Sequence, residues 1–388
     1  MTKVPLHFVT SRVTISKSRR DLFDPRHSLA EKFTFLIGAS GILDRVEEGD
    51  QVAIKTHFGD RGTTKAIRSL YVRRLALAIA DKGAHPFVTE TTGLGMRYPR
   101  SFGTGRLEIA KENGFTAETC AAPLVIADGL KGIDGVRVEV AGVALKEVYV
   151  ARAIAEADHV VSLAHFKGHA LGGFGGALKN IGVGCVAKPT KFAIHLEEDL
   201  PVIDPERCSD CDVCSKLCPT GAIGKDHTID AGRCVRCLGC AESCPEHAVH
   251  VTWSSAERTS VKMVDAAKAV LDLLGPERFT YVNVLLDVTP QCDCIPHSDN
   301  ALVPDLGILA GADPLAIDRA SLDLVNACPP APSSALDKKI REDTFGEVYR
   351  TSTKAHPRFQ LQAARTLALG NPSYEIVVHD PFKEGADS

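Results

Sequence analysis

The sequence lacks several features that would assign it to common classes of protein. Nowhere do eighteen apolar residues run together, and the first twenty residues contain basic side chains but no apolar stretch. Neither a membrane-spanning helix nor an export signal is therefore expected. The chain also has no extended basic run, and its net charge is −4. These features argue against nucleic acid as the main partner, so any binding of anions must be local.

Cysteine, in contrast, is abundant. Eight of the 13 cysteines fall into two copies of one spacing, C-x2-C-x2-C-x3-C-P, which begin at Cys208 and Cys234. This spacing is the signature of bacterial ferredoxins with two [4Fe-4S] clusters, in which the fourth cysteine of each run crosses to the other cluster. A disulfide framework or a pair of zinc ribbons is the alternative, but zinc sites use two C-x2-C pairs and need neither the third cysteine nor the trailing proline.

The crossed pattern predicts two sets of cluster ligands. One cluster is expected at Cys208, Cys211, Cys214 and Cys244, and the other at Cys234, Cys237, Cys240 and Cys218. Thiolates at this density also predict a reducing, anaerobic cytoplasm, because an oxidising compartment would pair the cysteines.

The rest of the 388-residue chain predicts an α/β protein that carries the cysteine motifs as an insertion. Before them, strands are expected over 51–56, 85–90 and 157–163, and helices over 66–82 and 105–113. After them, helices are expected over 256–274, 314–325 and 359–369, and strands over 280–287, 306–310 and 374–379. Such alternation is typical of a mainly parallel sheet. We therefore expect an α/β core of two lobes, formed by residues 1–200 and 254–388, with a ferredoxin-like α+β module at 201–253.

A glycine-rich stretch from His165 to Gly184 is the main candidate for a binding site outside the cysteine motifs. Its glycines would let the backbone approach a ligand closely, and a helix that starts at Ala177 would offer free N–H groups to an anion. The stretch has neither G-x-G-x-x-G nor the Walker A arrangement, so it is not a generic nucleotide loop. A tight connection with solvated lysines is the alternative. Cationic side chains near the glycines are expected to face one pocket: His165, Lys167, His169, Lys179, Lys188, Lys191 and His195.

Two further segments carry candidate site residues. Cys292 and Cys294 could supply ligands to a soft metal or a further iron–sulfur site, which Cys185 could complete, although two reduced, buried cysteines are the alternative. His57 and Arg61 follow the strand 51–56, at the edge where ligands bind in open α/β sheets, but exposed loop residues would explain them equally well.

These stretches resemble the DUF362 family, a domain of unknown function that often carries an inserted or appended ferredoxin. The resemblance lies in residues 56–59, 166–169, 173–182, 292–294, 304–309 and 313–318, and it extends over nearly the whole chain. It implies the fold and the ferredoxin insertion, but little about the reaction.

A more distant similarity connects the spacing His169-x9-Lys179-x15-His195 with the nickel-pincer lactate racemase family. It implies a cofactor anchor at Lys179, a metal ligand at His195 and a proton-transfer residue at His169, with His57 and Arg61 in the substrate-facing turn. The chain departs from that family in having the cysteine motifs, and in Asn180-Ile181-Gly182 where leucine-proline-glycine is usual. From this similarity we therefore expect a ligand pocket at these residues, but not the nickel-pincer cofactor.

Three functions follow as hypotheses. The first is a redox enzyme that passes single electrons from two [4Fe-4S] clusters to a substrate or metal centre beside the glycine-rich stretch, since His195 and Pro201 are only six residues apart. It implies a redox partner protein and a small anionic substrate or cofactor. The second is a metal-dependent, racemase-like enzyme, and the third is a non-catalytic electron carrier or iron–sulfur assembly factor.

The same expectations give each candidate a role. The residues expected to act in catalysis are His57, His169, Lys179 and His195. The residues expected to bind the substrate or cofactor are Lys167, Gly172, Gly173, Gly175, Gly176 and Arg61.

Overall fold

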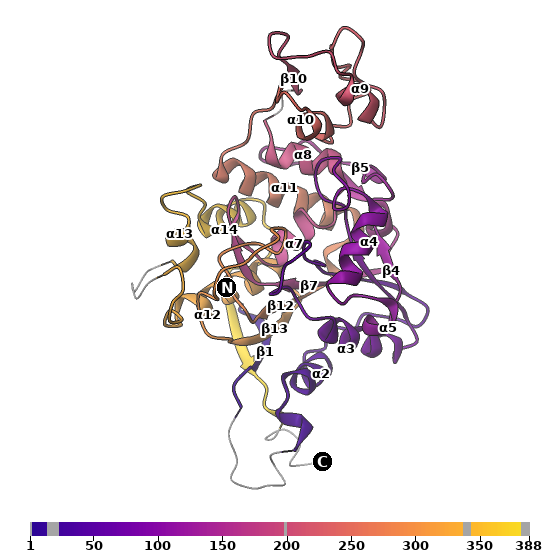
Figure 1. Cartoon of the computed structure of the whole chain (residues 1–388). Coiled ribbons are helices and arrows are strands. Elements are labelled where there is room, and N and C mark those ends of the chain that lie inside the picture. Colours follow the sequence, from indigo (N-terminus) through magenta and orange to yellow (C-terminus); the bar gives the residue numbers. More distant parts are fainter. Residues whose placement is uncertain (1, 14–22, 198–199, 337–342, 382–388) are drawn as a thin grey trace.

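An eight-stranded sheet forms the centre of the computed structural model, which describes residues 2–13, 23–197, 200–336 and 343–381 (Figure 1). From one edge to the other its strands are β14 (Tyr374–Val378), β1 (Val4–Thr10), β13 (Gly307–Gly311), β12 (Phe279–Leu285), β7 (His159–His165), β2 (Gln51–Lys55), β3 (His85–Glu90) and β4 (Leu124–Ile126). Neighbouring strands are parallel except at β13, which is antiparallel to both β1 and β12. The expected mainly parallel α/β core is confirmed.

The chain segments before and after the cysteine motifs share this sheet. Strand β7 pairs with β12 so that Leu163 lies beside Val282, and β1 lies between β13 and β14. The expectation of two lobes is therefore corrected: long-range strand pairing, which local patterns do not reveal, joins both segments into one sheet.

Helices cover both faces of the sheet, which explains why its central strands read as apolar runs. Successive residues of β7 point to opposite faces, and Val160 and Val161 accordingly belong to different hydrophobic clusters. The helices that contribute to the Val161 cluster are α2 (Leu29–Ala39) and α3 (Ser69–Ala80). Those that contribute to the Val160 cluster include α7 (Ala177–Gly182), α11 (Ala256–Leu274), α12 (Pro314–Asn326) and α14 (Pro357–Thr366).

All helices and strands expected outside the cysteine motifs are present, with ends shifted by a few residues. Helix α4 (Gly103–Glu112) is one of them. Elements that were not expected from the sequence include β1, β4, α2, η1 (Pro25–His27), α5 (Ala117–Cys120), β5 (Gly135–Glu139), β6 (Glu147–Ala151), α6 (Arg152–Ala155), β8 (Lys167–His169), β9 (Gly173–Gly175), α8 (Lys188–His195), η2 (Pro276–Arg278) and α13 (Thr344–Val348). No helix in the described ranges combines the length and apolar composition that crossing a bilayer requires.

Residues 201–253, called the cysteine segment below, extend from the core beyond α8 (Figure 1). The chain leaves and re-enters the core along paired backbones: the Ser254 amide donates to the His195 carbonyl at 2.9 Å, and the Glu197 amide donates to the Thr252 carbonyl at 2.8 Å. The two ends of the segment are thus adjacent in space, as an insertion into a folded core requires.

The cysteine segment is built as two similar halves. Strands β10 (Val202–Ile203) and β11 (Val249–His250) pair antiparallel, and the halves contain the short helices α9 (Val213–Leu217) and α10 (Gly239–Ser243). Asp210 and Asp212 have left-handed backbone angles, and so do Arg236 and Leu238, at the equivalent positions of the second half. The sequence repeat is therefore also a repeat of backbone conformation, while the ferredoxin-like nature of the segment stays a prediction.

Candidate functional site

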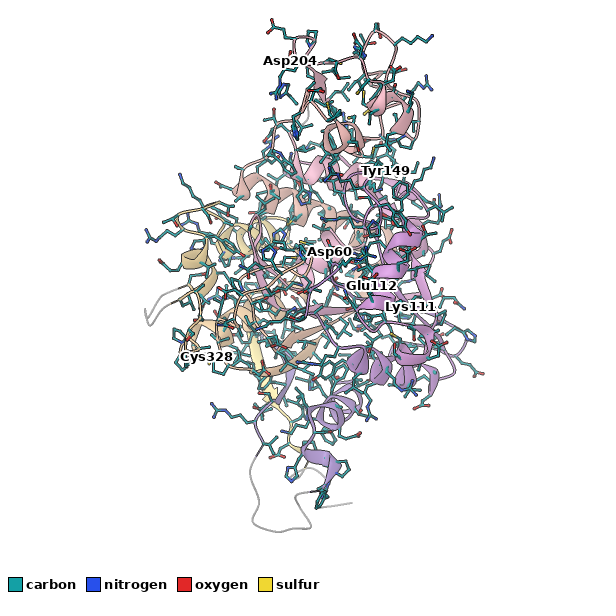
Figure 2. The ribbon with its side chains drawn as sticks, viewed as in Figure 1. Asp60, Lys111, Glu112, Tyr149, Asp204 and Cys328 are labelled. Carbon is teal, nitrogen blue, oxygen red and sulfur yellow. The ribbon has the colours of Figure 1, made fainter. Side chains whose placement is uncertain are left out.

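A cavity of about 300 Å³ lies at the carboxyl ends of β2, β3 and β7. Its walls come from the loops after these strands, from α7 and α8, and from the cysteine segment, which contributes Leu238, Glu242 and Trp253. Asp60, labelled near the centre of Figure 2, lies in the wall formed by the loop after β2. The carboxyl end of a parallel sheet is where open α/β proteins bind their ligands.

Most residues that the sequence singled out line this cavity: His57, His165, Lys167, His169, Gly175, Gly176, Lys179, Lys191, His195 and Cys294. Gly172 and Gly173 lie outside the wall and shape its loop. The Gly172 amide donates to Nδ1 of His169 at 2.8 Å, and Gly173 has a φ of +77°, which favours glycine.

Three residues expected in the site lie elsewhere. Arg61 is outside the cavity wall and pairs with Glu112 at 2.7 Å on the surface. Lys188 is buried, and its Nζ donates to the Lys131 carbonyl at 2.7 Å. Cys185 is also buried, with its Sγ 3.8 Å from the Asn180 carbonyl, and burial raises the pKa of this thiol to about 11. Arg61 and Lys188 were expected in the site because they are close in sequence to the first strand or the glycine-rich stretch, and Cys185 because it could complete a metal site. The direction of each side chain places all three outside the cavity wall.

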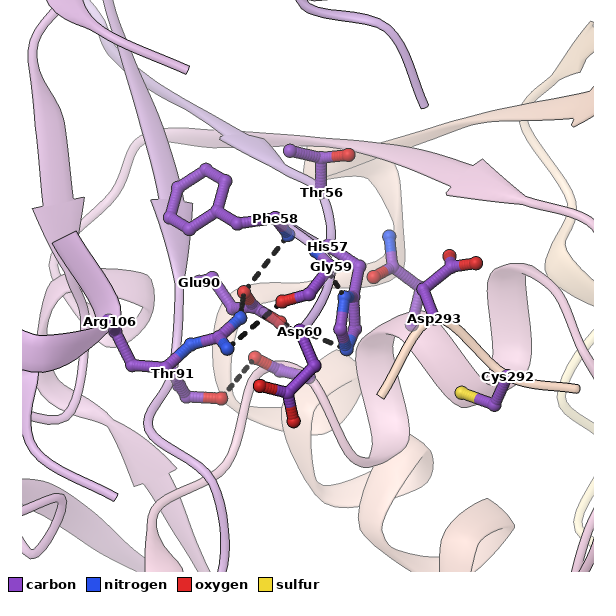
Figure 3. Close-up of polar contacts among 12 residues, drawn as sticks. Thr56, His57, Phe58, Gly59, Asp60, Glu90, Thr91, Arg106, Cys292 and Asp293 are labelled. Carbon is purple, nitrogen blue, oxygen red and sulfur yellow. Dashed lines mark hydrogen bonds and ion pairs between the residues drawn. The ribbon is translucent and has the colours of Figure 1, made fainter. Parts of the chain in front are cut away.

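A buried ion pair supports one wall of the cavity (Figure 3). Glu90, at the end of β3, forms an ion pair with Arg106 of α4, and both side chains are at most 6% exposed. The Glu90 carboxylate also accepts from the Phe58 amide at 3.0 Å and lies 3.4 Å from Nε2 of His57. Burial lowers the pKa of His57 to about 4. Glu90 thus fixes the loop that carries His57.

Buried lysines contribute positive charge to the wall of the cavity. Nζ of Lys55 donates to the Thr56 carbonyl at 2.7 Å and to Oδ1 of Asn180 at 3.2 Å. Within the described part of the chain, neither Lys55 nor Lys179 has a carboxylate within 4 Å. Burial lowers the pKa of Lys55 and lowers that of Lys191 to about 8. Buried ammonium groups without carboxylate partners, as at Lys55 and Lys179, favour an anionic ligand.

The sequence analysis missed Lys55, Glu90 and Arg106. Lys55 and Glu90 are charged residues at the carboxyl ends of predicted strands, and this placement is the signal that could have identified them. Arg106 lies within a helix, and nothing local distinguishes it.

Gly184 leaves space for the Asn180 backbone and for the Lys55 side chain. A Cβ at Gly184 would lie 2.3 Å from the Asn180 carbonyl oxygen and 2.7 Å from Nζ of Lys55. A Cβ at Gly175 would make only ordinary contacts, at 3.4 Å from the Lys179 stem and 3.5 Å from that of Lys167. Close packing inside the protein therefore explains the glycine at position 184, which the sequence analysis assigned to a ligand, but not the glycine at position 175.

The amino terminus of α7 is not free to bind an anion. The Asp318 carboxylate of α12 accepts from the Ala177 amide at 2.7 Å and from the Leu178 amide at 2.9 Å. A Cβ at Gly176 would lie 2.3 Å from that carboxylate. The expectation of free N–H groups at this helix start is wrong, because a residue about 140 positions away in the chain caps them.

Two histidines that line the cavity are held in opposite tautomers. Nδ1 of His169 accepts from the Gly172 amide, so its neutral ring carries the proton on Nε2. Nδ1 of His195 lies 2.7 Å from the Lys191 carbonyl oxygen, so it carries the proton and leaves the lone pair on Nε2. Burial lowers the pKa of His195 to about 4 and that of His169 well below its usual value. One neutral ring is therefore a donor, and the other is an acceptor.

The residue that lies beside Cys292 and Cys294 is His169, and not Cys185 as expected. Their sulfur atoms and a ring nitrogen of His169 all lie within 4.8 Å of one another, and Nζ of Lys179 lies 3.5 Å from Sγ of Cys292. His169 thus takes the position that the sequence analysis gave to Cys185. Two thiolates and an imidazole match a soft-metal donor set, but the Gly172 amide holds the His169 ring in the tautomer that donates from Nε2.

Two smaller cavities lie within the cysteine segment, and each is lined by four cysteines. The outer cysteine set consists of Cys208, Cys211, Cys214 and Cys244. The inner cysteine set consists of Cys218, Cys234, Cys237 and Cys240. These groups are the crossed sets that the spacing predicts, and four thiols around one space suit the ligation of a [4Fe-4S] cluster. That clusters occupy them stays a prediction.

The inner cysteine set lies against the core. Cys237 is buried, and its carbonyl accepts from the Gly95 amide at 2.8 Å. Its neighbour Leu238 lines the large cavity and packs with Phe192 and Leu196. In the outer set, by contrast, Cys211 is exposed. The inner set therefore lies against the wall of the large cavity, while the outer set includes a solvent-exposed cysteine.

Comparison with known proteins identifies the family. The family described as "Domain of unknown function (DUF362)" matches residues 52–323. The chain belongs to the DUF362 family. This match covers the strands, the glycine-rich stretch and the Cys292 loop that form the cavity, and it includes the cysteine segment. The DUF362 description itself assigns no reaction.

Individual relatives match this DUF362 protein over limited lengths. Pyruvate synthase subunit PorD of Methanothermobacter thermautotrophicus is 50% identical over 30 residues, which is 8% of this chain and 37% of that subunit. The lactate racemase apoprotein of Thermoanaerobacterium thermosaccharolyticum superposes with a TM-score of 0.35 and 16% identity over 66% of this chain and 49% of its own. A Thermotoga maritima protein gives a TM-score of 0.41 and 11% identity over 78% and 59%.

Proposed function

We propose that this DUF362 protein is an iron–sulfur oxidoreductase, in which two [4Fe-4S] clusters, held by the inner and outer cysteine sets, serve a small anionic substrate in the large cavity. The observation that carries the proposal is the shared wall: Leu238, adjacent to Cys237 of the inner set, lines the cavity that holds the buried lysines. Clusters in the two sets would supply one-electron transfer.

The two cysteine sets differ in exposure in the way that such a function requires. Cys211 of the outer set is exposed, and Cys237 of the inner set is buried against the core. A redox partner protein would therefore meet the outer set, while the inner set faces the substrate. Electrons would then pass from the partner to the outer set, from there to the inner set, and from the inner set to the substrate.

The cavity residues would bind and orient the anion. Lys55 and Lys179 lack carboxylate partners among the described residues, so they are available to pair with negative oxygen atoms. His169 would donate a proton or a hydrogen bond from Nε2, and His195 would accept one at Nε2. Glu90 would hold His57 in the same wall through its contact with Nε2 of that ring.

Anion binding to Lys179→Met tests the cavity directly, with oxalate as the probe and calorimetry as the measurement. Losing a hydrogen bond to a charged group costs about 1.5 to 3 kcal/mol, so oxalate affinity should fall roughly ten- to a hundredfold. Lys111→Met, at the exposed lysine of α4 labelled in Figure 2, is the matched control and should bind like the unaltered protein. Equal affinity in both variants, or no binding by the unaltered protein, would refute the anion site.

Electron paramagnetic resonance tests the link between cavity and clusters. Oxalate should change the signal of one reduced cluster, because the inner set borders the cavity and the outer set does not. If oxalate binds with the expected affinity and leaves both signals unchanged, the cavity is not coupled to the cysteine segment.

The opposed tautomers of His169 and His195 favour a second candidate, a metal-dependent enzyme that moves a proton without net redox change. One ring would remove a proton from a substrate carbon while the other returns one, and a metal would be held by the sulfur atoms of Cys292 and Cys294. Deuterium uptake from solvent into a 2-hydroxy acid, without any electron donor, would favour this candidate. Its absence in protein that carries bound metal would exclude it.

A further inference from the structure

Two thiols outside the cysteine segment lie together at the large cavity. Cys292 is 1% exposed, and Cys294 lines the cavity. Both belong to the loop that follows β12, and their sulfur atoms lie within 4.8 Å of each other. A small rotation of the two side chains would bring the sulfur atoms close enough to form a disulfide.

The residue between the two cysteines is anchored on both sides. The Asp293 carboxylate lies 2.9 Å from Nδ1 of His165 and 2.9 Å from Nζ of Lys167. Asp293 is 1% exposed, and although burial by itself would raise the pKa of this carboxyl, His165 and Lys167 lower it well below its usual value. The backbone is therefore held while the thiols at either side remain free to react with each other.

The surroundings of the pair are those of a reactive dithiol. Nζ of Lys179 lies 3.5 Å from Sγ of Cys292, and the proton-bearing ring of His169 completes the group. A hydrogen bond with Cys294 lowers the pKa of Cys292, and the nearby Lys179 ammonium adds to this effect in spite of burial. The same hydrogen bond raises the pKa of Cys294. A stabilised thiolate beside a neutral thiol is the reduced form of dithiol redox couples.

We propose that Cys292 and Cys294 form a reversible disulfide that collects two electrons beside the substrate cavity. The proposal rests on the function proposed above, in which the clusters deliver electrons one at a time. In the reductive step the Cys292–Cys294 bond accepts two electrons and one proton from solvent, and the S–S bond breaks. A thiolate at Cys292 and a thiol at Cys294 result, while each of the two clusters is oxidised by one electron.

This pair would store, next to the anion site, the two electrons that a two-electron reduction of substrate needs. Lys179 has a part in both sites, because it contacts Cys292 and lines the cavity. Its positive charge would stabilise the thiolate that reduction produces, and an anion bound at Lys179 would weaken that stabilisation. Occupancy of the cavity and reduction of the pair are thereby coupled.

Anaerobic reductive titration of the full-length protein, combined with thiol counting by mass spectrometry, tests the proposal. After mild oxidation, the peptide containing Cys292 and Cys294 should carry a disulfide, and full reduction should consume about four electrons per chain, one per cluster and two for the disulfide. Cys294→Ser should consume about two, with both clusters still reducible. Cys328→Ser and Cys185→Ser, which remove thiols outside the pair, should still consume about four.

The outcomes separate this proposal from the function on which it rests. If the clusters take up electrons but Cys294→Ser consumes as many as the unaltered protein, or no Cys292–Cys294 disulfide is found, the dithiol proposal is refuted. A stoichiometric metal other than cluster iron that is lost in Cys294→Ser would also refute it, in favour of a metal site. If no cluster accepts electrons while the disulfide still forms, the proposed oxidoreductase function fails and the dithiol chemistry stands.

Discussion

Replacing Glu90 by glutamine removes the charge from one side of a buried ion pair and leaves the shape of the side chain nearly unchanged. In the folded protein the carboxylate pairs with Arg106, accepts from the Phe58 amide at 3.0 Å and lies 3.4 Å from His57. Both side chains of the ion pair are at most 6% exposed, so water cannot solvate the Arg106 guanidinium once the charge of Glu90 is removed. The variant therefore tests whether this wall of the cavity depends on the charge of Glu90.

The size of the effect follows from the burial. Leaving one partner of a buried pair uncompensated destabilises a protein by about 3 to 5 kcal/mol. The pKa of Glu90 leads to a similar figure: burial alone would raise it, but Arg106, His57 and Lys55 outweigh burial and lower it from 4.5 to about 2. That difference corresponds to roughly 3 kcal/mol of stability. Because the folded value lies below the unfolded one, this stability is present above pH 4.5 and is lost as the pH falls toward 2.

Denaturant and thermal unfolding at pH 7 measure the loss, with iron content determined in parallel to exclude cluster loss as the cause. Glu112→Gln is the matched control, because it makes the same substitution in the exposed Arg61–Glu112 pair and should shift the midpoint far less. A second variant, Glu90→Gln combined with Arg106→Met, should recover part of the loss. If Glu90→Gln unfolds no more readily than Glu112→Gln, the wall does not depend on this charge.

Three further predictions follow from the same structure. Cys214→Ala should damage chiefly the cluster of the outer set and Cys218→Ala that of the inner set, and damage to the same cluster in both, seen by electron paramagnetic resonance, would contradict the crossed assignment. Deleting residues 201–253 and joining the ends by a short flexible linker should leave a core that unfolds cooperatively, because the two ends are already paired, and loss of cooperative unfolding would contradict the insertion. Burial lowers the pKa of His195 from 6.5 to about 4, so its contribution to stability is lost as the pH falls from 6.5 to 4. His195→Gln should therefore flatten the fall of the thermal midpoint over that range, and an unchanged slope would contradict a buried neutral ring.

Local sequence patterns predicted most of the core of this fold. Strands β2, β3, β7 and β12 read as apolar runs because helices cover both of their faces, and α12 has its capping aspartate and first-turn proline in the sequence. The pairing of β7 with β12 could not be predicted, since nothing in either strand specifies a partner more than a hundred residues away. The expectation of two lobes failed for this reason.

In the candidate site, too, the sequence identified residues with a local signal and missed contacts made by long-range packing. His57, His169, Lys179 and His195 were found because each lies near a glycine-rich turn or a strand end. The capping of α7 by Asp318 was missed, because a carboxylate brought in from another helix by tertiary packing leaves no mark near Ala177. Long-range packing likewise decides which residue joins Cys292 and Cys294, and it selects His169 rather than Cys185.

The cluster content of the protein tests the central claim most directly. Protein purified without oxygen should contain about eight irons and eight sulfides per chain, because each cysteine set supplies four thiolates to one cubane. After reduction, electron paramagnetic resonance should show two interacting [4Fe-4S] clusters. Zinc in place of iron, or about four irons with one cysteine set empty, would contradict the account.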